Sequence, residues 1–156
     1  MKRSLLALTV TLALGCSEPP RAAAMKIESR EQLIGGRRAL AEVGDYKLTN
    51  GIIQAIVQEK GHSRGFGAFG GSLIDLDLVR GGKESSALGV AGNDHFTEMF
   101  PAFFLEAIEP SEVAILSDGS LGPAVIRVSG KGAEFLSLTK TINDVVVNQP
   151  LDYHVD

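Results

Sequence analysis

The chain has 156 residues, of which 44% are hydrophobic and 22% charged, and its 15 Lys and Arg against 19 Asp and Glu give a net charge of -4 at pH 7. This length and composition predict one domain with one core. The acidic balance, without a basic stripe, argues against a nucleic-acid partner, because such a surface repels phosphates.

The N-terminus has the parts of a secretory signal, since Lys2-Arg3 is followed by an apolar run over 5–14 and a small residue, Gly15. The run is too short to span a bilayer, which takes about 20 apolar residues. The segment Ala13-Leu14-Gly15-Cys16 resembles the lipobox of bacterial lipoproteins, in which the cysteine is lipidated. Cys16 is the only cysteine, and lipidation leaves no reactive thiol. We therefore expect lipidation at Cys16; an ordinary small residue after signal cleavage is the alternative.

Three regions follow from this interpretation: a lipoprotein signal peptide over 1–15, the lipidated cysteine and a tether over 16–27, and a domain over 28–156. Ser17 after the cysteine resembles the sorting signal for the outer membrane. We expect a cell-envelope protein that is held to a membrane by its lipid, because several acyl chains together give stable anchoring.

The first elements are a short helix and a hairpin. Ser29 and Gln32 have the spacing of a capping box, which predicts a helix over Ser29 to Val43 that Gly35-Gly36 interrupts. From Tyr46 the pattern changes to strands. Asn50-Gly51 between Tyr46–Thr49 and Ile52–Gln58 predicts a β-hairpin, because both turn residues tolerate positive φ.

Residues 65–70 read Gly-Phe-Gly-Ala-Phe-Gly, which matches the glycine pattern of dinucleotide-binding folds. That fingerprint requires a helix directly after the glycines. Residues 71–79 instead alternate apolar and polar side chains with period two, which is typical of a half-buried strand. We therefore predict a glycine-rich loop that leads into a strand, and we expect no cofactor.

Asp75 and Asp77 lie on one face of that predicted strand. Paired carboxylates are candidates for acid-base catalysis, calcium binding or contact with a sugar hydroxyl. The favoured alternative is that both lie on the solvated face of an amphipathic strand.

Residues 81–92 are predicted to form a surface loop, and a second group of polar side chains follows it. Asn93 could cap a turn that brings His95 and Glu98 to one face beside Asp94. Asp94, His95 and Glu98 are therefore weak candidates for a divalent metal site, and His95 and Glu98 also for catalysis. The favoured alternative is a capped turn with a surface histidine, since no second ligand cluster completes a site.

Four phenylalanines and a methionine over 96–104 have helical spacing, which Pro101 interrupts. We expect these residues to pack in the core; an aromatic surface for a lipid or a sugar is the alternative. The stripe consists of Phe96, Met99, Phe100, Phe103 and Phe104.

The remainder is predicted to be β structure. The strands are expected over 113–116, 124–128, 135–142, 145–147 and 151–155, with turns at 117–120 and 130–132. Short strands separated by turn residues predict a mainly β fold, an antiparallel β-sandwich with one or two short helices. Because the chain stops within a strand pattern, we expect the domain to be incomplete or the leading part of a longer protein.

Four segments resemble, in this order, the start of large predicted lipoproteins from myxobacteria and their relatives. The resemblance covers about residues 40–156. It implies half of a large antiparallel sandwich related to the galactose-mutarotase-like supersandwich, with any chemistry beyond residue 156, and it transfers no catalytic residue. The segments are 43–51 (Val-Gly-Asp-Tyr-Lys-Leu-Thr-Asn-Gly), 69–80 (Phe-Gly-Gly-Ser-Leu-Ile-Asp-Leu-Asp-Leu-Val-Arg), 94–101 (Asp-His-Phe-Thr-Glu-Met-Phe-Pro) and 117–119 (Ser-Asp-Gly).

Two functions are compatible with these features. The first is a lipid-anchored, non-catalytic envelope module that binds glycan or acts as a scaffold. The second is an extracellular carbohydrate-active hydrolase or lyase, or its N-terminal part, with Asp75, Asp77, His95 or Glu98 in its site. A nicotinamide-dependent redox enzyme is a third hypothesis, but we expect the chain not to bind the nicotinamide cofactor.

Overall fold

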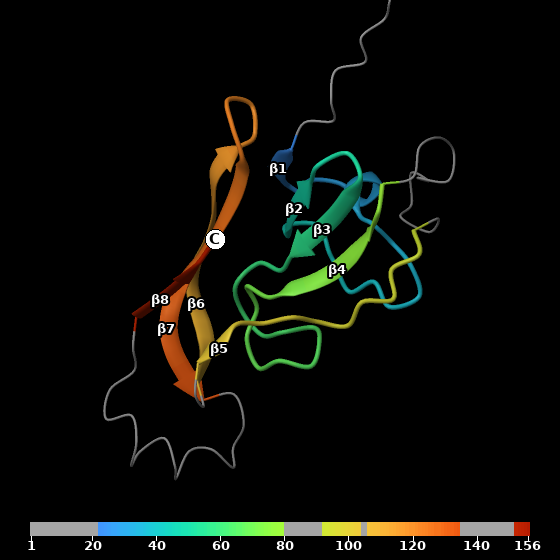
Figure 1. Ribbon diagram of the computed structural model, residues 1–156. Coiled ribbons are helices and arrows are strands. Elements are labelled where there is room, and N and C mark those ends of the chain that lie inside the picture. The colour runs from blue at the N-terminus through green and yellow to red at the C-terminus, as the bar shows by residue number, and fades with distance from the viewer. Residues whose placement is uncertain (1–21, 80–91, 104–105, 135–151) are drawn as a thin grey trace, which may run out of the picture.

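The computed structural model describes residues 22–79, 92–103, 106–134 and 152–156 (Figure 1). Two antiparallel sheets make up this part of the chain, which confirms the predicted mainly β sandwich. The lipobox, residues 81–91 of the predicted loop and the strands predicted over 135–142 and 145–147 lie outside the described residues.

The N-terminal sheet has the order β1-β2-β3-β4. Its strands are β1 (Ala23–Lys26), β2 (Tyr46–Thr49), β3 (Ile53–Val57) and β4 (Leu73–Leu78). Strand β1 lies within the segment predicted to be tether, so the sandwich begins at Ala23 rather than at residue 28. These residues belong to the sheet because β1 pairs with β2, with Ala23 opposite Thr49.

The C-terminal sheet has the order β5-β6-β7-β8. Its strands are β5 (Ala102–Phe103), β6 (Glu106–Asp118), β7 (Ala124–Glu134) and β8 (Asp152–Val155). Pro110 lies inside β6, where the register shifts between Pro110 and Glu112. A bulge is one of the few places in a sheet where proline is tolerated, because the position makes no ladder hydrogen bond.

The core lies in two clusters, not the single one expected. Between the sheets, Ala24 and Tyr46 pack with Ile108, Ile126 and Val128 among others. The second cluster lies on the other side of the N-terminal sheet, under the segment that joins β1 to β2, and contains Ile27, Ile34, Ile56 and Ile74. The N-terminal sheet is therefore covered on both faces, in part by irregular chain.

The predicted hairpin at Asn50-Gly51 is confirmed, with Gly51 at a φ of 80°. The connection is longer than two residues, since Thr49 pairs with Gln54. Asn50 Oδ1 accepts hydrogen bonds from the amides of Ile52 and Ile53, both at 2.9 Å. The asparagine thus closes the turn with its side chain.

The helix predicted over Ser29 to Val43 is wrong except for its start. The only helix among the described residues is the 3-10 turn η1 (Arg30–Gln32). Gln32 Oε1 does accept the Ser29 amide at 3.1 Å, as the capping-box spacing predicts. The chain after η1 instead forms the irregular cover of the N-terminal sheet, with Ile34 buried beneath it.

The helical stripe over 96–104 is also wrong. Residues 95–98 have no helical hydrogen bonds, and Met99 pairs with Leu73 as an isolated antiparallel bridge. Met99 is 61% exposed, and Phe96 and Phe100 are only partly buried, so these three do not form the expected core. Spacing of i, i+3 and i+4 arose here in extended chain. The side chains of Phe103 and Phe104 lie outside the description.

The turn predicted at 130–132 is strand in the structure. Gly130 pairs with Pro110 and Tyr153, and Gly132 pairs with Ile108. A Cβ on Gly130 would lie 2.1 Å from the Glu109 carbonyl oxygen. The glycines therefore permit close approach of neighbouring strands rather than reversing the chain.

Within the described ranges of the chain, we find no helix that is both long and apolar enough to cross a membrane.

Replacing Gly119 with alanine should destabilise the sandwich. Gly119, in the β6–β7 turn, has a φ of 90°, and an added Cβ would lie 2.0 Å from the Ala22 carbonyl oxygen. We expect Gly119→Ala to lower the free energy of unfolding by about 1–3 kcal/mol, measured by urea titration. Gly122→Ala is the matched control, since nothing lies within 4 Å of its added Cβ. Equal stability of the two variants would contradict this packing.

Candidate functional site

The glycine-rich loop after β3 folds around the carboxylate of Glu98. Oε1 accepts hydrogen bonds from Ser63 Oγ at 2.7 Å and Ser72 Oγ at 2.6 Å, while Oε2 accepts the amide of Gly67. A Cβ on Gly65 would lie 2.5 Å from Glu98 Oε2, so the close approach depends on glycine. Strand β4 follows the loop, as predicted. The loop amide that could hold a phosphate is thus occupied by a carboxylate of the same chain.

These contacts shift the pKa of Glu98. Desolvation raises the pKa, but the hydrogen bonds from Ser72, Ser63 and the loop backbone outweigh desolvation and bring the pKa below its ordinary value. A lowered pKa means that the ionised form is favoured in the folded protein. Glu98 therefore stabilises the fold above the pKa that it has in the unfolded chain, and this contribution is lost as the pH falls through the folded value.

Asp75 and Asp77 do share a face of β4, but the favoured solvated interpretation is wrong for Asp75, which is fully buried. Its Oδ1 accepts the Leu40 amide at 2.8 Å and its Oδ2 accepts the Ala41 amide at 3.2 Å. Asp77, which is partly buried, accepts the Asn93 amide at 2.7 Å. Each carboxylate thus accepts backbone amides from an irregular segment of the chain, Asp75 from the segment before β2 and Asp77 from the segment after β4.

A bulge in β4 explains the depth of Asp75. Val57 pairs with Leu73 and Ile56 with Asp75, so that Ile74 is an extra residue between the two pairs. Strict alternation fails at a bulge, and Ile74 and Asp75 are both fully buried. Desolvation raises the pKa of Asp75 to about 6, against the two amide hydrogen bonds and with further contributions from the charges of Asp94 and Asp45.

Asp94, His95 and Glu98 do not form a common site. Asp94 is fully buried, and its Oδ1 accepts the amides of Leu76 and Phe96, both at 3.0 Å. His95 is exposed and contacts Asn93 Oδ1 through Nε2 at 3.1 Å. Over the part of the chain that the structure describes, no group of three or more His, Cys, Asp or Glu side chains is arranged to hold a metal ion.

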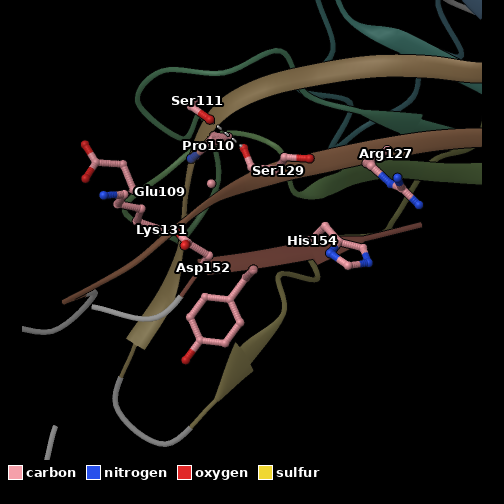
Figure 2. Close-up of a pocket in the computed structure, with 10 residues that line it drawn as sticks. Glu109, Pro110, Ser111, Arg127, Ser129, Lys131, Asp152 and His154 are labelled. Atoms are coloured by element: carbon pink, nitrogen blue, oxygen red, sulfur yellow. Dashed lines mark hydrogen bonds between the residues drawn. The ribbon is translucent and has the colours of Figure 1, made fainter. Parts of the chain in front are cut away.

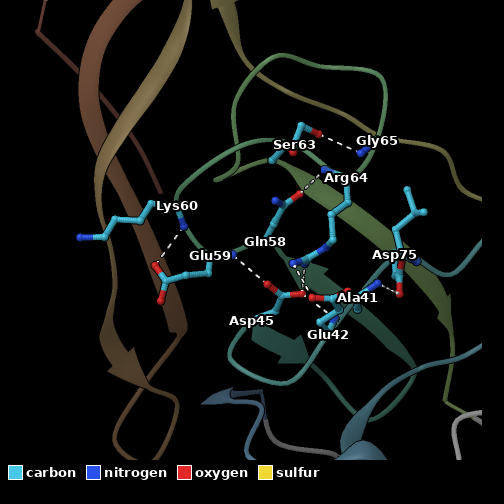
Figure 3. Close-up of polar contacts among 12 residues, drawn as sticks. Ala41, Glu42, Asp45, Gln58, Glu59, Lys60, Ser63, Arg64, Gly65 and Asp75 are labelled. Atoms are coloured by element: carbon cyan, nitrogen blue, oxygen red, sulfur yellow. Dashed lines mark hydrogen bonds and ion pairs between the residues drawn. The ribbon is translucent and has the colours of Figure 1, made fainter.

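A buried ion pair beside the glycine-rich loop was not anticipated from sequence (Figure 3). Asp45, which is 1% exposed, accepts the Glu59 amide at 2.9 Å and the Glu42 amide at 2.8 Å and also pairs with the Arg64 guanidinium. Gln58, 2% exposed, accepts the Arg64 amide at 3.1 Å. Asp45 follows Gly44 in a turn, which is a usual place for an aspartate, so the sequence carried no signal of burial.

A groove of about 600 Å³ lies over the outer face of β6, β7 and β8 (Figure 2). Two rows of facing residues cross it: Glu109, Lys131 and Asp152 in one, and Ser129 and His154 in the other. The lining consists of Glu109, Pro110, Ser111, Arg127, Ser129, Gly130, Lys131, Asp152, Tyr153 and His154. Sequence reasoning missed this groove, because alternating polar residues on a strand read as ordinary solvent face.

Charges in the groove are balanced along its length. Arg127 donates to both carboxylate oxygens of Asp156 at 2.5 Å from Nε and Nη2. Lys131 stands between Glu109 and Asp152 in the register. The groove therefore offers hydrogen-bond donors and acceptors side by side without a strong field of one sign.

No family model matches this chain, and comparisons with curated proteins and with solved structures give no significant match.

Asp75 should give the protein an unusual pH dependence. Because its folded pKa of about 6 lies above the ordinary 3.8, the folded chain binds more protons than the unfolded chain between these values. The free energy of unfolding should therefore fall by about 3 kcal/mol from this group as the pH rises from about 4 to about 6. Asp75→Asn should remove that slope in urea titrations at each pH. Glu112→Gln, at an exposed carboxylate, is the control that should retain it; retention in Asp75→Asn would contradict the assignment.

Glu98 and His95 should differ sharply on substitution. Glu98→Gln removes the charge and replaces one of the two acceptor oxygens by an amide donor that faces the loop. We expect a loss of about 2 kcal/mol in the free energy of unfolding, because hydrogen bonds to a charged group are among the stronger ones. His95→Ala, at an exposed side chain, should change it by less than about 0.5 kcal/mol. Thermal and urea unfolding of both variants measure this. A stable Glu98→Gln variant would show that the loop does not depend on the carboxylate.

Proposed function

We propose that the chain is a lipid-anchored cell-envelope module, non-catalytic, which binds a glycan in the groove over β6, β7 and β8. The anchor is the lipidated Cys16, with the outer membrane as its expected location. The observation that supports the binding role most directly is the groove itself. Its volume of about 600 Å³ lies within the usual range for ligand sites.

The alternative, a carbohydrate-active hydrolase or lyase, is less well supported. Most glycoside hydrolases use two carboxyl groups that flank the scissile bond. Asp75 and Glu98 each have both oxygens hydrogen-bonded to groups of the protein itself, and Asp77 also holds a backbone amide. His95 remains exposed but stands apart from Glu98. The carboxylates of Asp75, Asp77 and Glu98 thus hold irregular segments of the chain in place.

The chemistry of the groove favours a neutral, hydroxyl-rich ligand. Lys131 is flanked by Glu109 and Asp152, and Arg127 is paired with Asp156, so an anionic ligand would find little uncompensated positive charge. The polar side chains would not suit an apolar ligand. Sugar hydroxyls both donate and accept hydrogen bonds, which matches alternating carboxylate, ammonium, hydroxyl and imidazole groups. The chain has no Trp and the Tyr153 ring packs against the core between the sheets, so hydrogen bonds rather than ring stacking would hold the sugar.

Glycan binding should depend on Lys131 and His154. We expect heat on titration of the protein with cell-wall or capsular sugars, and about a tenfold weaker affinity for Lys131→Ala or His154→Ala, since loss of one hydrogen bond costs up to about 1.5 kcal/mol. Arg37→Ala is the matched control, at an exposed cation outside the groove. Absence of heat with every sugar at millimolar concentration, or equal weakening by Arg37→Ala, would refute the assignment.

A further inference from the structure

The chain enters the sandwich at one end of the N-terminal sheet. Ala23, the first residue of β1, pairs with Thr49 at the end of β2, and Thr49 pairs with Gln54 near the start of β3. The β2–β3 turn and the last residues of β4 therefore lie at the same end as Ala22. Figure 1 shows β1 and the β2–β3 turn at the same end of the sheet.

The tip of the β6–β7 hairpin belongs to this end as well. Gly119 is buried, and its missing Cβ would lie 2.0 Å from the Ala22 carbonyl oxygen. The tip thus packs directly beside the point where the chain enters (Figure 1). Two residues further on, Leu121 is fully exposed. A large apolar side chain that projects wholly into solvent from a turn has no structural role within the described residues.

Further apolar side chains are exposed at the same end. Ile52 is 61% and Leu78 is 55% exposed, and Ile53 and Val79 are partly exposed beside them. Ile53 pairs with Leu78, and the Val79 amide donates to the Ile52 carbonyl oxygen at 2.7 Å. These four residues are therefore neighbours where β3 begins and β4 ends. Exposed apolar residues that gather at one end of a molecule are typical of an interaction site rather than of scattered surface residues.

We infer that this end of the molecule rests on the lipid surface, with Leu121 inserted at the boundary between headgroups and acyl chains. The inference rests on the proposed anchor at Cys16. Only five residues, 17–21, separate the lipidated cysteine from Ala22, and the six steps from one Cα to the next span at most about 20 Å. The apolar end is thus the end that the anchor holds closest to the bilayer, where burial of its side chains is favourable.

This orientation leaves the groove accessible. Leu121 lies beyond the Ala124 end of β7, whereas Lys131 lies near its Glu134 end and pairs with Asp152 of β8. A strand advances about 3.3 Å per residue, so the lysine stands well above the plane in which Leu121 meets the lipid. The ligand-binding face would then be turned away from the membrane.

A fluorescent probe at position 121 tests the inference. Cys16 is the only cysteine, so in the lipidated full chain a cysteine introduced by Leu121→Cys takes a thiol-reactive, environment-sensitive dye alone. Phe66→Cys is the matched control, because Phe66 is also an exposed apolar residue, 76% exposed, but lies on the β3–β4 loop at the opposite end. Each labelled protein is reconstituted into phosphatidylcholine vesicles with and without nitroxide-labelled lipid, and mass spectrometry reads the lipid on Cys16.

We expect the dye at position 121 to show blue-shifted emission that lipid-borne nitroxide quenches. We expect the dye at position 66 to emit as it does in water. Equal, water-like emission at both positions with the lipid present on Cys16 would overturn this inference alone. A blue shift at position 121 that lipid-borne nitroxide does not quench would also overturn it, and would indicate a second copy of the chain as the partner. Absence of lipid on Cys16 would overturn the proposed anchor and this inference together.

Discussion

Buried carboxylates hold the irregular chain of this protein onto its N-terminal sheet. Asp45, Asp75 and Asp94 are almost wholly removed from solvent, and with Glu98 they accept hydrogen bonds from backbone amides in the segments before β2, after β3 and after β4. Burial of an ionised carboxylate is unfavourable unless it is hydrogen-bonded. Each of these groups therefore specifies where a loop lies, in segments that have little regular structure of their own.

This use of carboxylates divides the molecule into regions with different roles. The polar groups inside are engaged with the backbone, whereas the groups on the outer face of β6, β7 and β8 remain accessible in a groove (Figure 2). The end that carries Leu121 and the β2–β3 turn is apolar and lies where the chain enters. That distribution supports the proposed module, in which one end meets a membrane and one face binds a ligand.

Sequence reasoning succeeded where local chemistry decides the structure. The hairpin at Asn50 and the strand after the glycine-rich loop follow from turn residues and period two. Period two also placed Asp75 and Asp77 on one face, but it cannot tell what covers that face, and the covering segment has no periodicity. The contact of Gly67 with Glu98 joins residues 31 apart, so no local pattern could predict it. The helical spacing of apolar residues over 96–104 misled because the same spacing can occur by coincidence in an extended chain.

Carboxylates, rather than strand pairing, hold the loops of the N-terminal sheet in place. Native-state amide hydrogen exchange tests this most directly. The amides of Leu40, Ala41, Gly67 and Phe96 lie outside the strands and donate to a carboxylate. The account predicts that these amides exchange as slowly as those of β3 and β4, since they open only when the sheet and its cover separate. Exchange of these amides near the rate of an unstructured chain would contradict it.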